Sequence, residues 1–167
     1  MIKNFNTLFV TMFGIGKLKP IPGTFGSLAT VIILYFLFHT FEISSNLILL
    51  GLVVIFIYSF SAVTSYTKDK ENKDPREIVI DEFIGQSIPI YLYEISHGTD
   101  KNPNEVLIFY TICFFLFRYF DIMKPFPVSY FDKKHKNSFG VIMDDVCAGL
   151  YVVLSLICFM FLKNYIL

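Results

Sequence analysis

Five apolar segments are the feature that most constrains how this chain of 167 residues can fold. They cover residues Leu28–Phe41, Leu47–Val63, Phe83–Tyr93, Val106–Phe120 and Val146–Leu162. Hydrophobic residues make up 54% of the chain and charged residues only 17%, and the mean hydropathy is +0.59. This apolar surface exceeds what a small water-soluble core can bury, so the sequence predicts a membrane protein.

The segments are expected to be helices, because none alternates with period two over enough residues for a membrane barrel. At a rise of about 1.5 Å per residue, even the longer segments fall somewhat short of a hydrocarbon core of about 30 Å. The third segment is the shortest and contains Gln86, Ser87 and Pro89, so it is either a short span or re-entrant. We expect an all-α integral membrane bundle with about five hydrophobic helices, in a single domain over residues 1–167.

The basic residues indicate the topology. From the N-terminal stretch through the four connections to the C-terminal tail, the numbers of Lys and Arg are 3, 0, 4, 1, 5 and 1. Cytoplasmic loops are enriched in Lys and Arg, so this alternation fits five spans with a cytoplasmic N-terminus. A re-entrant third segment would place Lys101 inside and reverse the last two spans, which the counts disfavour.

Four polar clusters fall at segment ends that this topology places on the cytoplasmic side. They are the stretch Gly14–Ser27, the pair Asp81-Glu82, the stretch Arg118–Asp132 and the pair Asp144-Asp145. Acidic residues at the ends of membrane segments are expected to face the bundle interior or water, and they are candidates for function.

In the first cluster, Pro22-Gly23 is a turn signal, and Thr24 or Ser27 is expected to cap the helix that follows. Free backbone N–H groups there, with the hydroxyls of Thr24 and Ser27, would also suit an anion such as phosphate.

The acidic pairs have a simpler alternative reading, since carboxylates near a helix N-terminus stabilise its dipole. Two adjacent carboxylates entering an apolar segment fit a functional site better than that alternative. In the third cluster, Asp121 and Lys124 are three residues apart and could form a plain ion pair, although Pro125 is expected to end the helix there. Asp132 lies in a Lys-rich loop, and its role stays open.

These residues together suggest a metal site. Neither the three His nor the three Cys residues cluster with the carboxylates, so the predicted ligands are all oxygens. Such a ligand set points to Mg²⁺, with Mn²⁺ as the alternative. Basic residues beside such a cluster, here Lys124 and Arg118, imply a phosphate-bearing substrate. The predicted metal ligands are Asp81, Glu82, Asp121, Asp144 and Asp145.

Four motifs, GIGKLKPIPGTFGSL, IDEFIG, FRYFDIMKPFPVSYFD and FGVIMDDVCAGL, resemble those of the phosphatidylglycerophosphatase A family in order and spacing. The resemblance implies a Mg²⁺-dependent, multi-pass phosphatase of the bacterial inner membrane. It would hydrolyse phosphatidylglycerophosphate to phosphatidylglycerol and inorganic phosphate at the cytoplasmic side. Its partners would be membrane lipids and not nucleic acid; the oligomeric state stays open.

By the same resemblance, the catalytic positions are the six residues Asp81, Glu82, Asp121, Lys124, Asp144 and Asp145. Thr24, Ser27, Arg118 and Lys124 would contact the substrate. A different class of protein, a small cation transporter, would use the same carboxylates as an ion pathway. That alternative predicts acidic residues near the middle of the membrane rather than at one face.

Overall fold

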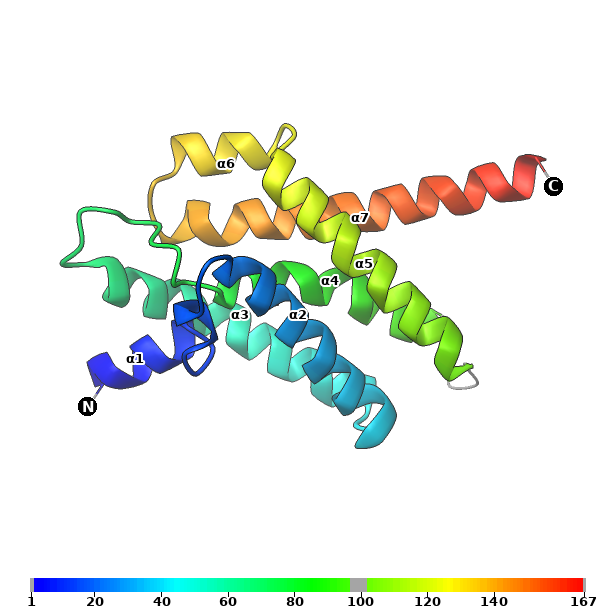
Figure 1. Cartoon of the computed structure of the whole chain (residues 1–167), viewed down its shortest axis with the longest axis horizontal. Coiled ribbons are helices and arrows are strands. Elements are labelled where there is room, and N and C mark those ends of the chain that lie inside the picture. Colours follow the sequence, from blue (N-terminus) through cyan, green and yellow to red (C-terminus); the bar gives the residue numbers. More distant parts are fainter. Residues whose placement is uncertain (1, 97–101, 167) are drawn as a thin grey trace.

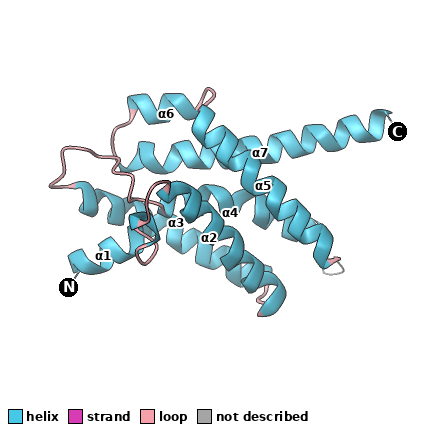
Figure 2. Ribbon diagram, in the orientation of Figure 1, coloured by secondary structure: helices cyan, strands magenta, loops and turns pink. Residues whose placement is uncertain are grey.

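The computed structural model describes residues 2–96 and 102–166, and every regular element in these ranges is a helix (Figure 2). The helices are α1 (Ile2–Val10), α2 (Pro22–Tyr35), α3 (Ser45–Thr67), α4 (Ile80–Ser96), α5 (Pro103–Met123), α6 (Val128–Lys134) and α7 (Ser138–Ile166). A short 3-10 turn, η1 (Ile15–Lys17), precedes α2, and a π-helical turn, η2 (Phe36–Thr40), extends it. The predicted all-α class is confirmed.

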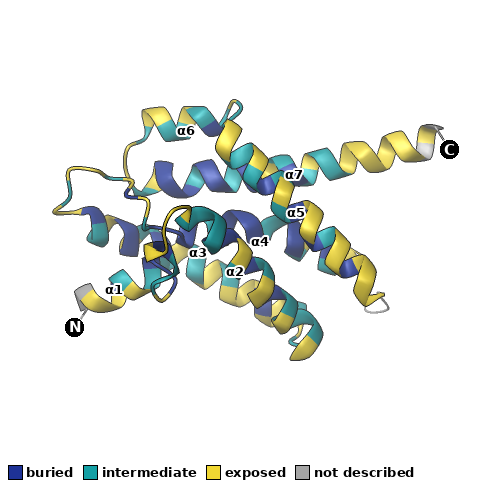
Figure 3. Cartoon of the chain, in the orientation of Figure 1, coloured by how far each residue is buried: buried dark blue, intermediate teal, exposed yellow. Residues whose placement is uncertain are grey.

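Four helical stretches are long and apolar enough to cross a membrane. They are Pro22–Thr40, Ser45–Thr67, Pro103–Met123 and Ser138–Lys163. Large apolar side chains such as Ile57, Phe115 and Phe161 are exposed on these helices, as the yellow stretches of α3, α5 and α7 in Figure 3 show. Apolar surface of this extent needs lipid rather than water around it, so the chain is a membrane protein.

The third apolar segment forms α4, which has 17 residues and is not among the four candidate spans. It is short, as expected, and a count of five spans is therefore not confirmed. α4 packs against α2, α3, α5 and α7, and much of it is dark blue in Figure 3. Because protein covers it on several sides, its polar residues are removed from lipid.

Two apolar clusters hold α4 in this central place. Val63 of α3, Val79 just before α4 and Ile142 of α7 belong to the first cluster. Ile90 of α4 and Phe117 of α5 belong to the second. These residues are almost completely buried, so α4 is fixed toward both of its ends by side chains from neighbouring helices.

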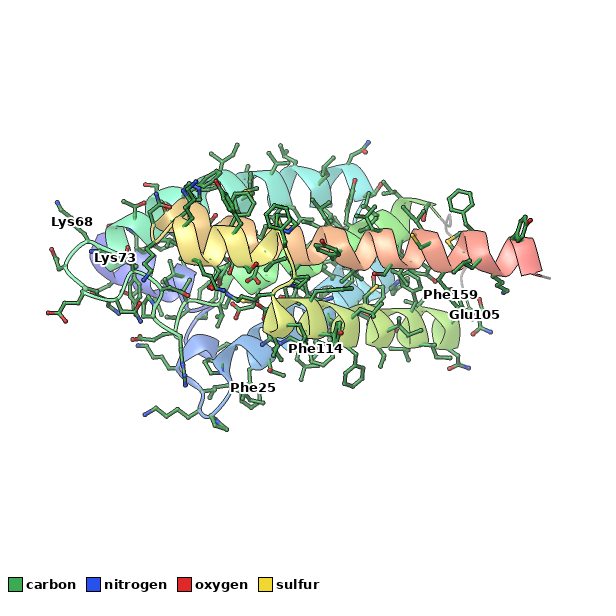
Figure 4. The ribbon with its side chains drawn as sticks, turned by 90° about the horizontal axis from the view of Figure 1, so that it is seen from above. Phe25, Lys68, Lys73, Glu105, Phe114 and Phe159 are labelled. Atoms are coloured by element: carbon green, nitrogen blue, oxygen red, sulfur yellow. The ribbon has the colours of Figure 1, made fainter. Side chains whose placement is uncertain are left out.

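Successive long helices run in alternating directions. α2, α4 and α7 begin at the end of the bundle where α3 and α5 finish (Figure 1). In Figure 4, Lys68 and Lys73 lie toward this end of the molecule, while Glu105 and Phe159 lie toward the other. The first turns of three helices and the last turn of α5 therefore meet at one end, which we call the acidic end.

Two glycines allow α4 and α7 to cross in close contact. A Cβ atom on Gly149 would collide with the backbone carbonyl of Gly85, and a Cβ on Gly85 would collide with the carbonyl of Asp145. Small residues permit this kind of close backbone approach between membrane helices. The crossing brings the first turn of α4, with Asp81 and Glu82, beside the part of α7 that carries Asp145.

Candidate active site

A cavity of about 630 Å³ opens at the acidic end, between the first turns of α2 and α4, the end of α5 and the first part of α7. Eight of the nine residues predicted for the site line it: Thr24, Asp81, Glu82, Arg118, Asp121, Lys124, Asp144 and Asp145. The ninth, Ser27, lies behind this lining and accepts a hydrogen bond from Arg118 Nη1 at 3.4 Å. Residues separated by more than a hundred positions in the chain thus share one cavity.

Three carboxylates converge most closely, and we call Asp81, Glu82 and Asp145 the acidic trio. One oxygen from each lies within 4.8 Å of the others. Asp81 Oδ1, Glu82 Oε2 and Asp145 Oδ1 are buried, and none has a hydrogen-bond partner among the residues that the structure describes. Burying unpaired carboxylates is costly, whereas a divalent cation among them would offset that cost with the oxygen ligands that Mg²⁺ prefers.

Arg118 connects three helices beside the trio. Its Nη1 lies 2.6 Å from Asp121 Oδ2 and 4.0 Å from Glu82 Oε1. Its bond to Ser27 reaches α2, where the Ser27 hydroxyl donates to the carbonyl of Gly23 at 3.0 Å. Gly23 leaves room for this arrangement, because a Cβ there would collide with the Glu82 carboxylate.

Lys124 occupies the position just after α5, in the left-handed region with φ 43° and ψ 57°. Its ammonium lies 2.5 Å from Asp132 Oδ1 and 2.8 Å from Asp144 Oδ2. Burial alone would lower the pKa of Lys124, but the two carboxylates, Asp144 above all, outweigh it and raise that pKa above its ordinary value. Lys124 therefore stays charged and holds Asp144 and Asp132 together.

The ion pair between Asp121 and Lys124, which the sequence left open, does not form. Asp121 pairs with Arg118 one turn earlier on α5, whereas Lys124 pairs across the site with Asp144 and Asp132. The helix ends at Met123, and the left-handed residue after it no longer shares a helical face with Asp121. The same set of contacts pairs Asp132 with Lys124, and a functional role of Asp132 stays open.

The five carboxylates predicted as metal ligands therefore fall into two groups. Asp81, Glu82 and Asp145 face one another. Asp121 instead pairs with the side chain of Arg118, and Asp144 with that of Lys124. Asp144 Oδ1 also accepts the N–H of Asp145 at 3.1 Å. The assignment of all five as ligands stays a prediction, and the trio is the part that the geometry favours.

The predicted capping of α2 by Thr24 or Ser27 is wrong. The helix begins at Pro22, its N-cap is Ile21, and no side chain caps it. Both hydroxyl residues therefore lie inside the first turns, where Ser27 bonds to Gly23 and Thr24 lines the cavity. The N–H groups of Gly23 and Thr24 belong to the first turn, which has no intrahelical acceptors for them.

Sequence reasoning missed three residues at or near the site. Asp74 and Arg76, from the loop before α4, line the cavity. In the sequence, Arg76 had been used only in the count of basic residues that indicates the topology. Desolvation raises the pKa of Asp74; Lys124 opposes this rise, and the carboxylates of Asp132 and Asp121 add to it. Gln86, one turn after Glu82, is fully buried, and neither atom of its amide has a partner in the described part of the chain. All three residues lie within seven positions of Asp81 in the sequence, and this proximity was the signal that could have identified them.

Comparison with known proteins identifies the family of the chain. The family model for phosphatidylglycerophosphatase A matches residues 8–160. The chain belongs to the phosphatidylglycerophosphatase A family. This membership confirms the resemblance seen in the four motifs, and the match includes every residue predicted for the site.

Relatives of this family support the assignment. The chain is 37% identical to phosphatidylglycerophosphatase A of Haemophilus influenzae, over 88% of this chain and 83% of that protein. It is 30% identical to phosphatidylglycerophosphatase A of Escherichia coli, over 86% of this chain and 76% of that protein. A Bacteroides thetaiotaomicron protein, provisionally named as a phosphatidylinositol-3-phosphatase, is 34% identical over 86% of each chain. No solved structure matches the chain.

Proposed function

We propose that this protein hydrolyses phosphatidylglycerophosphate to phosphatidylglycerol and inorganic phosphate, with Mg²⁺, at the cytoplasmic face of a bacterial inner membrane. The observation that carries the proposal is the acidic trio, whose buried carboxylate oxygens have no partner in the described ranges and face one cavity beside Arg118. The names of the two phosphatidylglycerophosphatase A relatives supply the reaction.

The donor set fits Mg²⁺. Asp81, Glu82 and Asp145 would hold it, since they offer hard oxygen ligands that no protein donor already occupies among the described residues. When bound, Mg²⁺ would polarise the phosphoryl group and promote deprotonation of water.

The remaining groups of the cavity would bind and orient the phosphate. Arg118 has a buried Nε–H without a partner in the described part of the chain, so it retains a donor for a phosphate oxygen. The N–H groups of Gly23 and Thr24 at the start of α2 would add hydrogen bonds to the same anion. Lys124 holds Asp144 in place and contributes positive charge to the cavity wall.

The reaction itself needs water and a proton acceptor. A water oxygen would form a bond to phosphorus as the bond between phosphorus and the glycerol oxygen breaks. A carboxylate of the cavity would take the proton of that water, and the departing glycerol oxygen would receive one. The diacyl tails would remain in the bilayer, because the cavity opens where apolar helices end.

Charge supports a cytoplasmic location for the acidic end. The loop between α3 and α4 and the segment after α5 reach this end, and both are rich in basic residues. Those residues are Lys68, Lys70, Lys73, Arg76, Lys133, Lys134 and Lys136. Such an excess favours the cytoplasmic side of a membrane protein.

The cation-transporter alternative is not favoured. A transporter would place carboxylates along a path through the bundle, with sites near mid-membrane. Here the trio and its neighbours gather at one end, and family membership indicates a phosphatase.

Phosphate release by the protein purified in detergent tests the proposal. Phosphatidylglycerophosphate should yield phosphate with Mg²⁺, none with EDTA, and phosphate again when Mg²⁺ is restored. Phosphatidylinositol 3-phosphate, suggested by the name of the Bacteroides relative, serves as a parallel substrate. If phosphatidylglycerophosphate stays intact in the presence of Mg²⁺, the proposed activity is wrong.

A further inference from the structure

Three cationic side chains line the cavity, and they differ in how they are paired. Lys124 contacts Asp132 and Asp144, and Arg118 contacts Asp121 and lies near Glu82. Arg76 is exposed, and in the described ranges it forms neither an ion pair nor a hydrogen bond through its side chain. Among the described cations of the cavity, Arg76 is therefore the one whose whole guanidinium is unpaired and exposed.

The backbone around Arg76 is held in place although its side chain is exposed. Pro75 on one side and Ile78 on the other are buried, and Val79 N–H donates to the carbonyl of Val10 at 2.9 Å. Glu77, the next residue, accepts hydrogen bonds from Tyr66 at 2.6 Å and Lys70 at 3.4 Å. Because the backbone is already fixed, only the Arg76 side chain must be ordered when a ligand binds, which lowers the entropic cost of binding.

The charge of the cavity favours a further cation for a lipid that carries two phosphate groups. The lining carries six carboxylates, Asp74, Asp81, Glu82, Asp121, Asp144 and Asp145, against the three cations. The proposed substrate has a terminal phosphomonoester and a second phosphate, the diester that joins glycerol to the diacylglycerol. Mg²⁺ would offset two of the three carboxylate charges of the trio, and Arg118 and Lys124 already face Asp121 and Asp144. The diester would therefore still meet a surplus of negative charge.

We propose that Arg76 binds the bridging phosphodiester of the lipid and so selects substrates that carry two phosphates. The inference rests on the proposed function and deepens it. A guanidinium matches a phosphate with two parallel N–H donors, which an ammonium does not. The two phosphates are thus divided between the trio with Arg118, deep in the cavity, and Arg76 at its exposed edge.

Kinetics of Arg76→Gln against phosphatidylglycerophosphate test the inference. Loss of a charged hydrogen-bonding partner should raise KM about 10- to 100-fold and change kcat little, because the lost contact lies away from the reacting phosphorus. Arg76→Lys keeps the charge without the two-donor geometry and should give an intermediate KM. The control is Lys68→Gln, an exposed cation of the same loop that lies outside the cavity lining and should match wild type (Figure 4).

Inhibition separates the two phosphate positions. Arg76→Gln should weaken inhibition by phosphatidylglycerol, which carries only the diester, and leave inhibition by inorganic phosphate unchanged. The inference is overturned if KM changes less than about twofold, or if both inhibitors weaken equally. Wild-type protein that releases no phosphate would refute the proposed function instead, whereas active wild type with an unaltered Arg76→Gln variant would refute only the role of Arg76.

Discussion

Both ends of this bundle bury carboxylates, but within the described residues the acidic end leaves three buried carboxylate oxygens without a protein partner. At the far end, the Glu94 side chain is 6% exposed, receives a hydrogen bond from the Tyr110 hydroxyl at 2.9 Å and lies 3.1 Å from His39 Nε2. At the acidic end, the three buried oxygens of the trio have no such partners within the described residues. A buried carboxylate with protein donors is satisfied, whereas one without them is costly unless a ligand supplies the missing partner.

The two ends also differ in what the neighbouring helices contribute. Glu94 connects α4 to α5 through Tyr110 and to η2 through His39, so its contacts stabilise the bundle. Contact between α4 and α7 instead forces the trio together, through the backbone approach at Gly85 and Gly149. We therefore expect stability at the acidic end to depend on a bound cation, and stability at the far end not to.

Replacing Asp145 with Asn should give the largest effect. The variant keeps the shape of the side chain but removes one charged ligand, so phosphate release should fall by about 10² to 10³-fold or more. The measurement is the initial rate at saturating Mg²⁺. The variant should elute from a size-exclusion column at the same volume as wild type. Wild-type rates in this variant would remove Asp145 from the proposed site.

Thermal unfolding of wild type and of Asp145→Asn adds a measurement that is independent of activity. In EDTA, Asp145→Asn should unfold at a higher temperature than wild type, because one of three mutually repelling carboxylates is neutral. Mg²⁺ should stabilise wild type, by about 2.7 kcal/mol at a hundred times the dissociation constant, and stabilise the variant less. Equal responses of both proteins to Mg²⁺ would argue against a metal at the trio.

Gly149→Ala tests whether helix approach assembles the trio. The added methyl would collide with the carbonyl of Gly85, so we expect a loss of about 1–3 kcal/mol in the free energy of unfolding. A shift of α7 by about 1 Å relative to α4 would lower activity by about 10²-fold. Gly51→Ala in α3 is the matched control, because a Cβ there meets nothing within 4 Å and should leave both quantities near wild type.

Glu94→Leu should give the smallest effect on catalysis. It leaves the buried Tyr110 hydroxyl without its acceptor, which should cost about 1–3 kcal/mol in the free energy of unfolding with or without Mg²⁺. Phosphate release per folded molecule should stay within about twofold of wild type, since Glu94 lies at the opposite end of α4 from the trio. A variant that is as stable as wild type but inactive would contradict the contrast between the two ends.

Most of the candidate site was predictable from the sequence, because unusual residues stand out in an apolar chain. The pairs Asp81-Glu82 and Asp144-Asp145 interrupt segments where a carboxylate is costly, and the charge pattern placed them at one end. Asp74 and Arg76 were less visible, since charged residues in a polar loop carry no such cost. Their place in the cavity depends on how the loop folds back before α4.

The sequence by itself determined that the chain forms apolar helices in a membrane, with acidic residues at one end. The length of an apolar segment and the cost of burying a carboxylate in it can both be read from the local sequence. Only the tertiary structure decided which carboxylates face one another and which pair with the side chain of Arg118 or Lys124. Asp144 and Asp145 are adjacent in sequence, yet one pairs with Lys124 and the other faces Asp81 and Glu82. Successive residues of a helix point in different directions, so their partners depend on which helices pack on each side.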